Sequence, residues 1–294
     1  MKTYLECIPC FFKQALEAAK LAGADEKMQK KILNDLARAL PKFPLSSSPP
    51  EMGRTIYGLV KKITKKEDPY LKIKRKSNTL SMNIYPRLKN KISCSGDRLL
   101  RALELAIAGN IIDYGVKNSL NVDGELKRIL DEEERTIKKE DKKNFNYHGF
   151  KESLKDAKSI LYLADNAGEV AFDRVLIEEI KRLDMNKEII YAVKEKPIIN
   201  DALTADAVRC GINKVAKIVS SGLDAPGTVL RFCSKKFLKI YKDVDMVISK
   251  GQGNFEALSM PGRPVFFLFM AKCPVVAKSV KCNVGDIILL YRKR

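Results

Sequence analysis

ILYLADNAGEVAFDRVLI, residues 160–177, decides the fold class, because a strand pattern passes into a helix pattern through a polar turn. The apolar run 160–164 predicts a buried strand, and residues 170–177 have the spacing of an amphipathic helix. An acid and an amide, Asp165 and Asn166, therefore stand where a strand ends and a helix begins. Open α/β sheets place ligand sites at such points, and a helix start favours an anion. A simple helix N-cap explains the same two residues equally well.

The second half of the chain alternates short apolar runs with helical or loop segments. This alternation predicts an α/β fold: a three-layer, Rossmann-like, mainly parallel sheet. The candidate strands are Ser159–Ala164, Glu188–Val193, Lys217–Ser220, Met246–Ser249, Val265–Phe269 and Ile287–Tyr291.

The first half has helical spacing instead, and Ser48 or a neighbour is placed to cap a helix. A charged run at 138–143, followed by residues 144–149, is the best boundary between the halves. We therefore expect a helical N-terminal region, 1–150, covering the site, and an α/β domain, 151–294, that binds metal and phosphate. The predicted helices are Phe11–Leu21, Lys30–Leu40, Thr55–Ile63, Asp97–Gly109 and Leu126–Ile137.

Composition narrows the functional classes. The hydrophobic content of 45% fits a globular protein, and no apolar run approaches the ~20 residues of a membrane span. The N-terminus lacks the basic-then-apolar order of a signal peptide, so we expect a cytoplasmic protein. The single His148 excludes sites built from several imidazoles, and seven irregularly spaced cysteines argue against a disulfide framework.

The formal net charge of +19 is large. It favours anionic partners, namely nucleic acid, acidic lipid or phosphorylated metabolites. Eight basic residues between positions 61 and 76 concentrate part of this charge. A solvated, lysine-rich surface is the simpler explanation.

Polar sequence follows each of the first four predicted strands, and parallel strands open these loops on one edge of the sheet. Asp165, Asn166 and Asp201 offer oxygen ligands suited to Mg²⁺ or Mn²⁺. Lys250 is a compact cation able to hold a phosphate oxygen. Glycines at 168, 251 and 253 allow the backbone to approach a ligand closely.

The sequence leaves the roles of two other motifs undecided. Asn110 and Asp113 lie three apart and could share a helical face, or they could belong to a helix C-cap. Cys7 and Cys10 could serve packing, a labile disulfide or part of a metal site.

The ordered set of motifs resembles the DUF89 family, the damage-control phosphatases with the ARMT1-like fold. The resemblance spans nearly the whole chain, and the cysteine pair is similar to that of the mainly prokaryotic subfamily. The motifs that carry it are Cys7-x-x-Cys10, Ala108-Gly109-Asn110-x-x-Asp113, Asp165-Asn166-Ala167-Gly168-Glu169, Asn200-Asp201 and Lys250-Gly251-Gln252-Gly253-Asn254-Phe255-Glu256.

The resemblance implies a metal-dependent phosphatase acting on sugar phosphates or damaged phosphometabolites, often with Mn²⁺, Co²⁺ or Ni²⁺ preferred over Mg²⁺. It implies that Asp165, Asn166 and Asp201 hold the metal and that Lys250 binds the substrate phosphate. Asn110 and Asp113 would line the pocket, with Gly168 at the anion-binding helix start and Glu169 and Asn254 nearby.

Phosphomonoester hydrolysis is therefore the leading hypothesis, with Asp165, Asp201 and Lys250 as catalytic residues. Either water or Asp165 is the nucleophile. One alternative is a nucleic-acid-associated protein that binds through Lys72, Lys74, Arg75 and Lys76. The other is a methyltransferase, which the sheet permits but for which the expected Gly-rich turn is missing.

Overall fold

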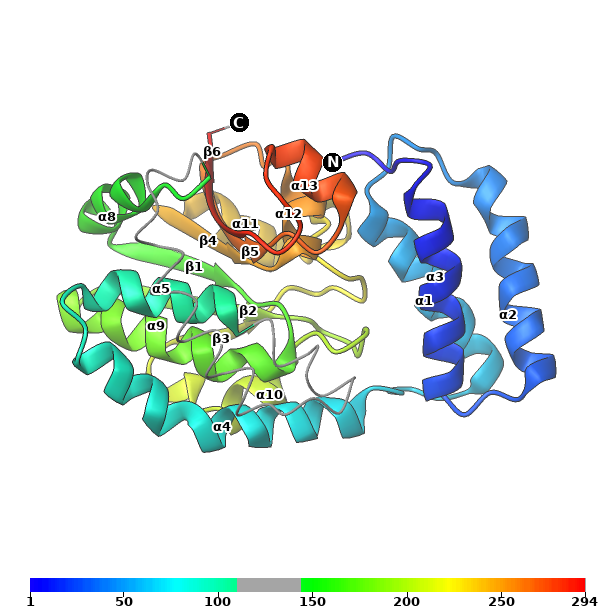
Figure 1. Ribbon diagram of the computed structural model, residues 1–294, viewed down its shortest axis with the longest axis horizontal. Helices are drawn as coiled ribbons and strands as arrows, with labels where there is room; N and C mark the ends of the chain where they lie inside the picture. The colour runs from blue at the N-terminus through cyan, green and yellow to red at the C-terminus, as the bar shows by residue number, and fades with distance from the viewer. Residues whose placement is uncertain (110–143, 294) are drawn as a thin grey trace.

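Residues 1–109 and 144–293 are described by a computed structural model of the protein (Figure 1). Its strands form one six-stranded sheet in the order β3-β2-β1-β4-β5-β6, parallel except for β6, which runs antiparallel to β5. The three-layer, Rossmann-like prediction is confirmed, and each predicted strand matches to within one residue at either end. The strands are β1 (Ser159–Leu163), β2 (Glu188–Val193), β3 (Lys217–Ser220), β4 (Met246–Lys250), β5 (Val265–Met270) and β6 (Ile287–Arg292).

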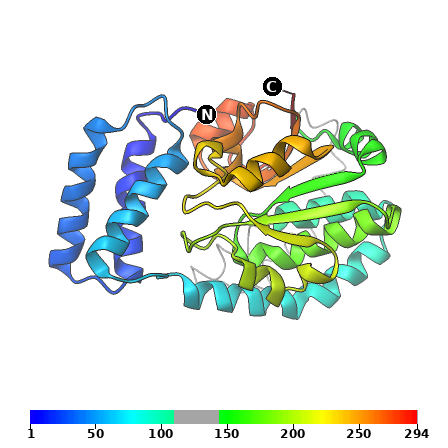
Figure 2. The same cartoon turned by 180° about the vertical axis from the view of Figure 1, so that it is seen from behind.

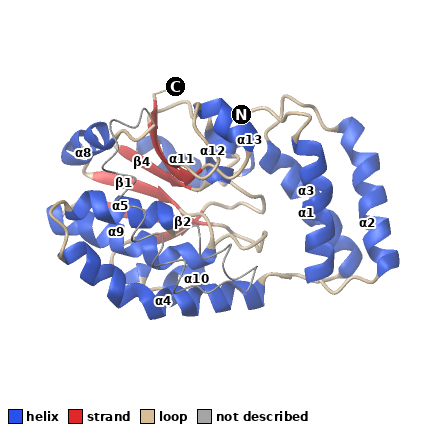
Figure 3. Cartoon of the chain, in the orientation of Figure 1, coloured by secondary structure: helices blue, strands red, loops and turns tan. Residues whose placement is uncertain are grey.

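Helices cover both faces of the sheet (Figure 3). In β1, Ile160 and Tyr162 join the apolar cluster on one face, while Leu161 and Leu163 join the cluster on the other. Burial on both faces explains why the strand reads as a continuous apolar run. The first face carries α4 (Leu71–Ser93), α5 (Arg98–Ala108), α8 (Tyr147–Asp156), α9 (Val170–Leu183) and α10 (Thr204–Arg209), and the second carries α11 (Lys235–Asp243), α12 (Gln252–Leu258) and α13 (Pro274–Val280).

Three N-terminal helices stand beside this body as a bundle, which we call the cap (Figures 1 and 2). The cap has its own apolar cluster, which includes Phe11, Ile32 and Ile56. Its third helix starts as predicted at Ser48, whose backbone N–H donates to the Glu51 carboxylate. The cap helices are α1 (Cys7–Leu21), α2 (Glu26–Ala39) and α3 (Pro49–Thr64).

The cap meets the loop between β3 and α11. Arg54 pairs with Asp224 at 2.7 Å, and Arg231 pairs with Glu51. Gly53 lies so close to Pro226 that an added Cβ would come 2.8 Å from the proline Cγ. These contacts hold α3 against a loop from the carboxyl edge of the sheet.

Helix α4 departs from the sequence analysis, which did not predict this 23-residue element. Its first turns contain part of the basic segment, but Lys74 is only 1% exposed and pairs with Asp68 at 2.7 Å. Lys74 is therefore not part of a basic surface, contrary to the nucleic-acid hypothesis. Helices α4 and α5 pack on α9 and share the apolar cluster of the sheet, whereas α1–α3 do not.

Short 3-10 turns link several elements, and η2 matters for the site. No helix in the described residues is both long enough and apolar enough to cross a membrane. The predicted helix at Leu126–Ile137 lies outside the described residues. The 3-10 turns are η1 (Leu40–Lys42), η2 (Ala167–Glu169), η3 (Ile212–Lys214) and η4 (Leu230–Phe232).

Candidate active site

The order of the strands reverses between β1 and β4, and the candidate site lies at the carboxyl ends of these strands and of β2. Asp165 and Asn166 follow β1, and Asn166 forms an isolated antiparallel bridge with Asp201, which follows β2. The backbone N–H of Ala202 donates to the Asp165 carbonyl at 2.8 Å. The turns after the two strands are therefore tied together, and this brings the three predicted metal ligands to one edge of the sheet.

Asp165 and Asn166 do not act as helix caps. Asn166 precedes η2 without a side-chain capping bond. Its Nδ2 instead donates to Asp165 Oδ2 at 3.2 Å and to Glu169 Oε1 at 2.8 Å. Both hydrogen bonds donated by the Asn166 amide go to carboxylates, so its amide oxygen is the atom that could bind a cation. The cap explanation that the sequence left open does not hold here.

Lys250 ends β4, is buried and holds two carboxylates at once. Its Nζ donates to Glu169 Oε2 and to Asp173 Oδ1, both at 2.9 Å. Burial alone would lower the pKa of Lys250, but Asp173 and Glu169 raise it above its ordinary value. Two of its three N–H groups are thus engaged by carboxylates.

Asp201 lies beside a second buried lysine, Lys194, with 3.4 Å between Lys194 Nζ and Asp201 Oδ2. That oxygen has no hydrogen-bond partner among the described residues. Burial raises the pKa of Asp201 to about 6, although the charge of Lys194 opposes this shift. Burial, with the charges of Glu169 and Asp201, raises the pKa of Asp165 well above its ordinary value. For both carboxylates, burial therefore outweighs the positive charges nearby.

The charge balance of the site fits a divalent cation. Four buried carboxylates stand with two buried ammonium groups at this edge, and the charges of Lys272 and Lys74 also act on Asp165 and Asp201. A divalent ion between Asp165, Asn166 and Asp201 would compensate these carboxylates further. Within residues 1–109 and 144–293, no three His, Cys, Asp or Glu side chains form a metal-binding group by themselves. A metal ion at this edge would therefore use the amide of Asn166 as well as carboxylates. The groups counted are Asp165, Glu169, Asp173, Asp201, Lys194 and Lys250.

The glycine-rich loop after β4 packs against the site. Gly251 has a φ of +85° and lies against the Asp165 carboxylate. Asn254 is buried and donates to the carbonyls of Ala164 at 3.0 Å and Lys250 at 2.6 Å, while it accepts from Thr228 at 2.7 Å. Both the nitrogen and the oxygen of the Asn254 amide are thus engaged in hydrogen bonds that join loops. Asn254 was predicted to bind substrate.

Of the other predicted residues, Gly168 and Glu169 lie buried in η2, one turn before α9. Asn110 and Asp113 lie outside the described residues. Sequence reasoning missed Asp173 and gave no role to Lys194. Lys194 directly follows a strand, which is the signal that could have marked it.

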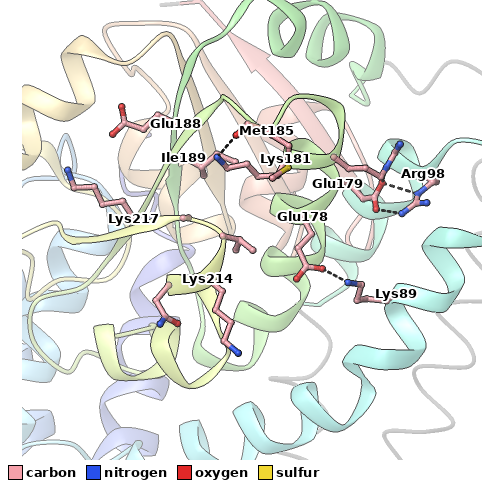
Figure 4. Close-up of a pocket in the computed structure, with 14 residues that line it drawn as sticks. Lys89, Arg98, Glu178, Glu179, Lys181, Met185, Glu188, Ile189, Lys214 and Lys217 are labelled. Carbon is pink, nitrogen blue, oxygen red and sulfur yellow. Dashed lines mark hydrogen bonds and ion pairs between the residues drawn. The ribbon is translucent and has the colours of Figure 1, made fainter.

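A separate groove of about 700 Å³ lies at the opposite, amino edge of β2 and β3 (Figure 4). Two of its carboxylates already have partners: Glu178 pairs with Lys89 at 3.0 Å, and Glu179 pairs with Arg98 at 2.5 Å. Ligands of open α/β sheets bind at the carboxyl ends of the strands. We therefore take the carboxyl edge, and not this groove, as the candidate site.

All seven cysteines lie in the described residues and are free thiols. Cys7 packs on the apolar cluster of the cap, while Cys10 is exposed and accepts a hydrogen bond from Gln14 at 3.1 Å. His148 is exposed.

A Rossmann-like sheet with buried carboxylates and lysines at its switch point defines an α/β protein with a polar ligand site. The chain matches the family model of the damage-control phosphatase ARMT1-like domain over residues 3–288 and therefore belongs to that family. This result confirms the resemblance seen in the sequence and assigns the chain to a phosphatase family, in preference to the two alternatives.

Archaeal proteins are similar to this chain over nearly its whole length. A damage-control phosphatase of Pyrococcus horikoshii is 33% identical over 296 residues, covering 100% of this chain and 99% of that protein. A damage-control phosphatase of Archaeoglobus fulgidus is 31% identical, covering 98% of both. The crystal structure of a DUF89 family protein from Pyrococcus horikoshii superposes with a TM-score of 0.87 at 32% identity, covering 100% of both chains.

Proposed function

We propose that the protein is a metal-dependent phosphatase that hydrolyses phosphomonoesters of sugar phosphates or of damaged phosphometabolites. The buried carboxylate of Asp201, which pairs with Lys194 at 3.4 Å, stands at the same strand edge as the buried carboxylate of Asp165, and these two groups carry the proposal. Clusters of buried carboxylates are costly, and groups with strongly perturbed pKa values gather at functional sites. Family membership supplies the phosphatase chemistry.

Asp165, Asn166 and Asp201 would hold the ion, which we expect to be Mn²⁺, Co²⁺, Ni²⁺ or Mg²⁺. A bound divalent ion supplies Lewis-acid polarisation of the phosphoryl group and activation of water. The third N–H of Lys250 would hold a phosphate oxygen and stabilise charge that develops on it. The start of α9, beyond Gly168, favours the same anion through its dipole.

The substrate would be a small phosphorylated metabolite. Lys250 and Lys194 provide positive charge close to the carboxylates, as a dianionic phosphate requires. Cap residues lie close to this edge, since Ile199, two residues before Asp201, packs against the apolar cluster of the cap. We therefore expect the cap to contact the part of the substrate beyond its phosphate.

The proposal is tested by measuring phosphate release from a panel of sugar phosphates with each of the four metals. Asp165→Asn and Asp201→Asn should each lower the rate by more than about 100-fold, because the loss of even an outer-shell partner costs 10–100-fold. Asp245→Asn is the matched control, since Asp245 is exposed at the opposite end of β4 and bonds to Ser159. Full activity in either site variant would refute the assignment.

A further inference from the structure

Asp173 is the centre of a buried polar network beneath the candidate site. Its Oδ1 accepts hydrogen bonds from Tyr162 at 2.8 Å and from Lys250 at 2.9 Å, and its Oδ2 accepts one from Tyr191 at 2.7 Å. Each of these side chains is at most 1% exposed. A buried carboxylate is tolerated when several donors compensate its lost hydration, and three donors do so here.

The donors reach Asp173 from three different strands. Tyr162 belongs to β1 and Tyr191 to β2, and their rings stack with centroids 5.4 Å apart. Lys250 comes from β4, on the other side of β1. Asp173 itself lies in the first turn of α9, so the network ties that helix to the three strands whose ends carry the site.

A stability role does not require such a network. An apolar core of the same volume is commonly as stable as a buried ionic one. The network is also continuous with the candidate metal ligands. Lys250 links Asp173 to Glu169, and Glu169 accepts from Asn166 at 2.8 Å.

The effect on Lys250 is geometric. A lysine side chain has a flexible four-carbon stem and positions its ammonium poorly when unrestrained. Here Glu169 and Asp173 each hold one N–H, both at 2.9 Å, and the two tyrosines hold Asp173 in turn. With two donors fixed, the direction of the third is fixed as well, which is the preorganisation that oxyanion stabilisation requires.

We propose that Asp173, held by Tyr162 and Tyr191, is a positioning residue that fixes the Lys250 ammonium group for an oxyanion of the ligand. This inference rests on the proposed function, in which Lys250 holds the phosphate. Under this proposal, Asp173 affects anion binding but not metal binding, although it belongs to helix α9 and not to the strand-end loops.

Calorimetry separates these two kinds of binding. Mn²⁺ is titrated into the protein, and inorganic phosphate or tungstate is then titrated into the Mn²⁺-loaded protein. Asp173→Asn should keep its Mn²⁺ affinity within about threefold of the wild type and lose about tenfold or more in oxyanion affinity, the usual scale for a charged hydrogen bond. Lys250→Met should lose oxyanion affinity to a similar or greater degree.

A double-mutant cycle shows whether Asp173 acts through Lys250. The variant that combines Asp173→Asn with Lys250→Met should bind the oxyanion no more weakly than Lys250→Met alone. Additive losses would overturn the inference, because Asp173 would then act independently. Unchanged oxyanion affinity in Asp173→Asn, or equal losses for metal and oxyanion, would overturn it as well.

Tyr191→Phe covers the case in which Asp173→Asn does not fold, because it removes one hydrogen bond and no charge. Its oxyanion affinity should fall by roughly twofold to fivefold, with Mn²⁺ affinity unchanged. Tyr241→Phe is the control, since Tyr241 is a buried tyrosine on the other face that donates to the Pro261 carbonyl at 2.9 Å. Equal oxyanion affinities in Tyr191→Phe and the control would overturn the inference. A wild-type protein that binds no oxyanion would count against the proposed function itself.

Discussion

Gly251 lies directly against the carboxylate of Asp165: a Cβ added to Gly251 would stand 2.0 Å from Asp165 Oδ2 and 2.1 Å from its Cγ. The two residues leave neighbouring strands, β1 and β4, at the point where the strand order reverses. Glycine at position 251 therefore makes room for a protein carboxylate. The sequence had suggested close approach of a ligand at this position.

Gly251→Ala is expected to displace Asp165 and abolish metal binding. The added methyl group cannot coexist with Asp165 Oδ2, and the positive φ adds about 1–3 kcal/mol of strain. Gly262→Ala is the control, because Gly262 also has a positive φ but an added methyl group there would meet nothing within 4 Å. Calorimetry with Mn²⁺ should show binding in Gly262→Ala and none in Gly251→Ala. Equal affinities would show that the loop adjusts without moving Asp165.

Asp165→Asn should make the metal-free protein more stable and should weaken its stabilisation by metal. Without metal, Asp165 repels Glu169 and Asp201 in a buried site, so its neutralisation should raise the melting temperature. With Mn²⁺ at 100 times the dissociation constant, the wild type should gain about 2.7 kcal/mol, and the variant should gain far less. In thermal melts, the variant should therefore have the higher melting temperature without Mn²⁺, and the wild type should have the higher one with Mn²⁺. A variant that melts below the wild type in both conditions would contradict the predicted repulsion.

The contact between the cap and the sheet loop can be tested with two glycines of α3. Gly58→Ala should stabilise the helix by about 0.5–1 kcal/mol, because nothing lies within 4 Å of the added methyl group. Gly53→Ala gains the same propensity but places its methyl group 2.8 Å from Pro226 Cγ. Its melting temperature should stay at or below that of the wild type. A rise equal to that of Gly58→Ala would mean that α3 does not press on this loop.

Glu256 in α12 predicts a pH dependence of stability. Burial raises its pKa from 4.5 to about 7, although a hydrogen bond from Gln252 opposes the shift. The folded state therefore holds this proton more tightly than the unfolded state, and stability declines as the pH rises from about 4.5 through 7. Glu256→Gln should remove that decline. Urea unfolding at pH 5 and pH 8 measures it, with the exposed Glu188→Gln as the control that should behave like the wild type.

The sheet was predictable because each strand is a short, nearly continuous apolar run between polar turns. Helix α4 was not, and its burial pattern explains why. Its buried face includes Lys74, Ser77, Asn78 and Ser81, and Asn78 donates to Asp206 at 2.7 Å. The apolar row of this helix, Ile84, Leu88 and Ile92, is confined to its second half, so the first half lacks the apolar stripe by which helices are recognised.

The candidate site likewise has a part that could be predicted from the sequence and a part that could not. The position of Asp165, Asn166 and Asp201 at one edge of the sheet could be predicted because they lie in loops that follow strands, which is a sequence-local property. The partners of Lys250 were not found, because Asp173 looks like one acid on a helix and Tyr162 and Tyr191 look like core residues. Only the fold brings α9 and three strands around one carboxylate.

The separate apolar cluster of α1–α3 affects how cooperatively the protein unfolds. Elements that share few buried contacts open with their own free energies, so we expect the cap and the α/β body to unfold as distinct units. Amide hydrogens of α1 and α2 should exchange faster than those of β1, and a calorimetric trace should be broader than a single two-state transition. Local opening of the cap would then expose the carboxyl edge of the sheet to solvent without unfolding the body.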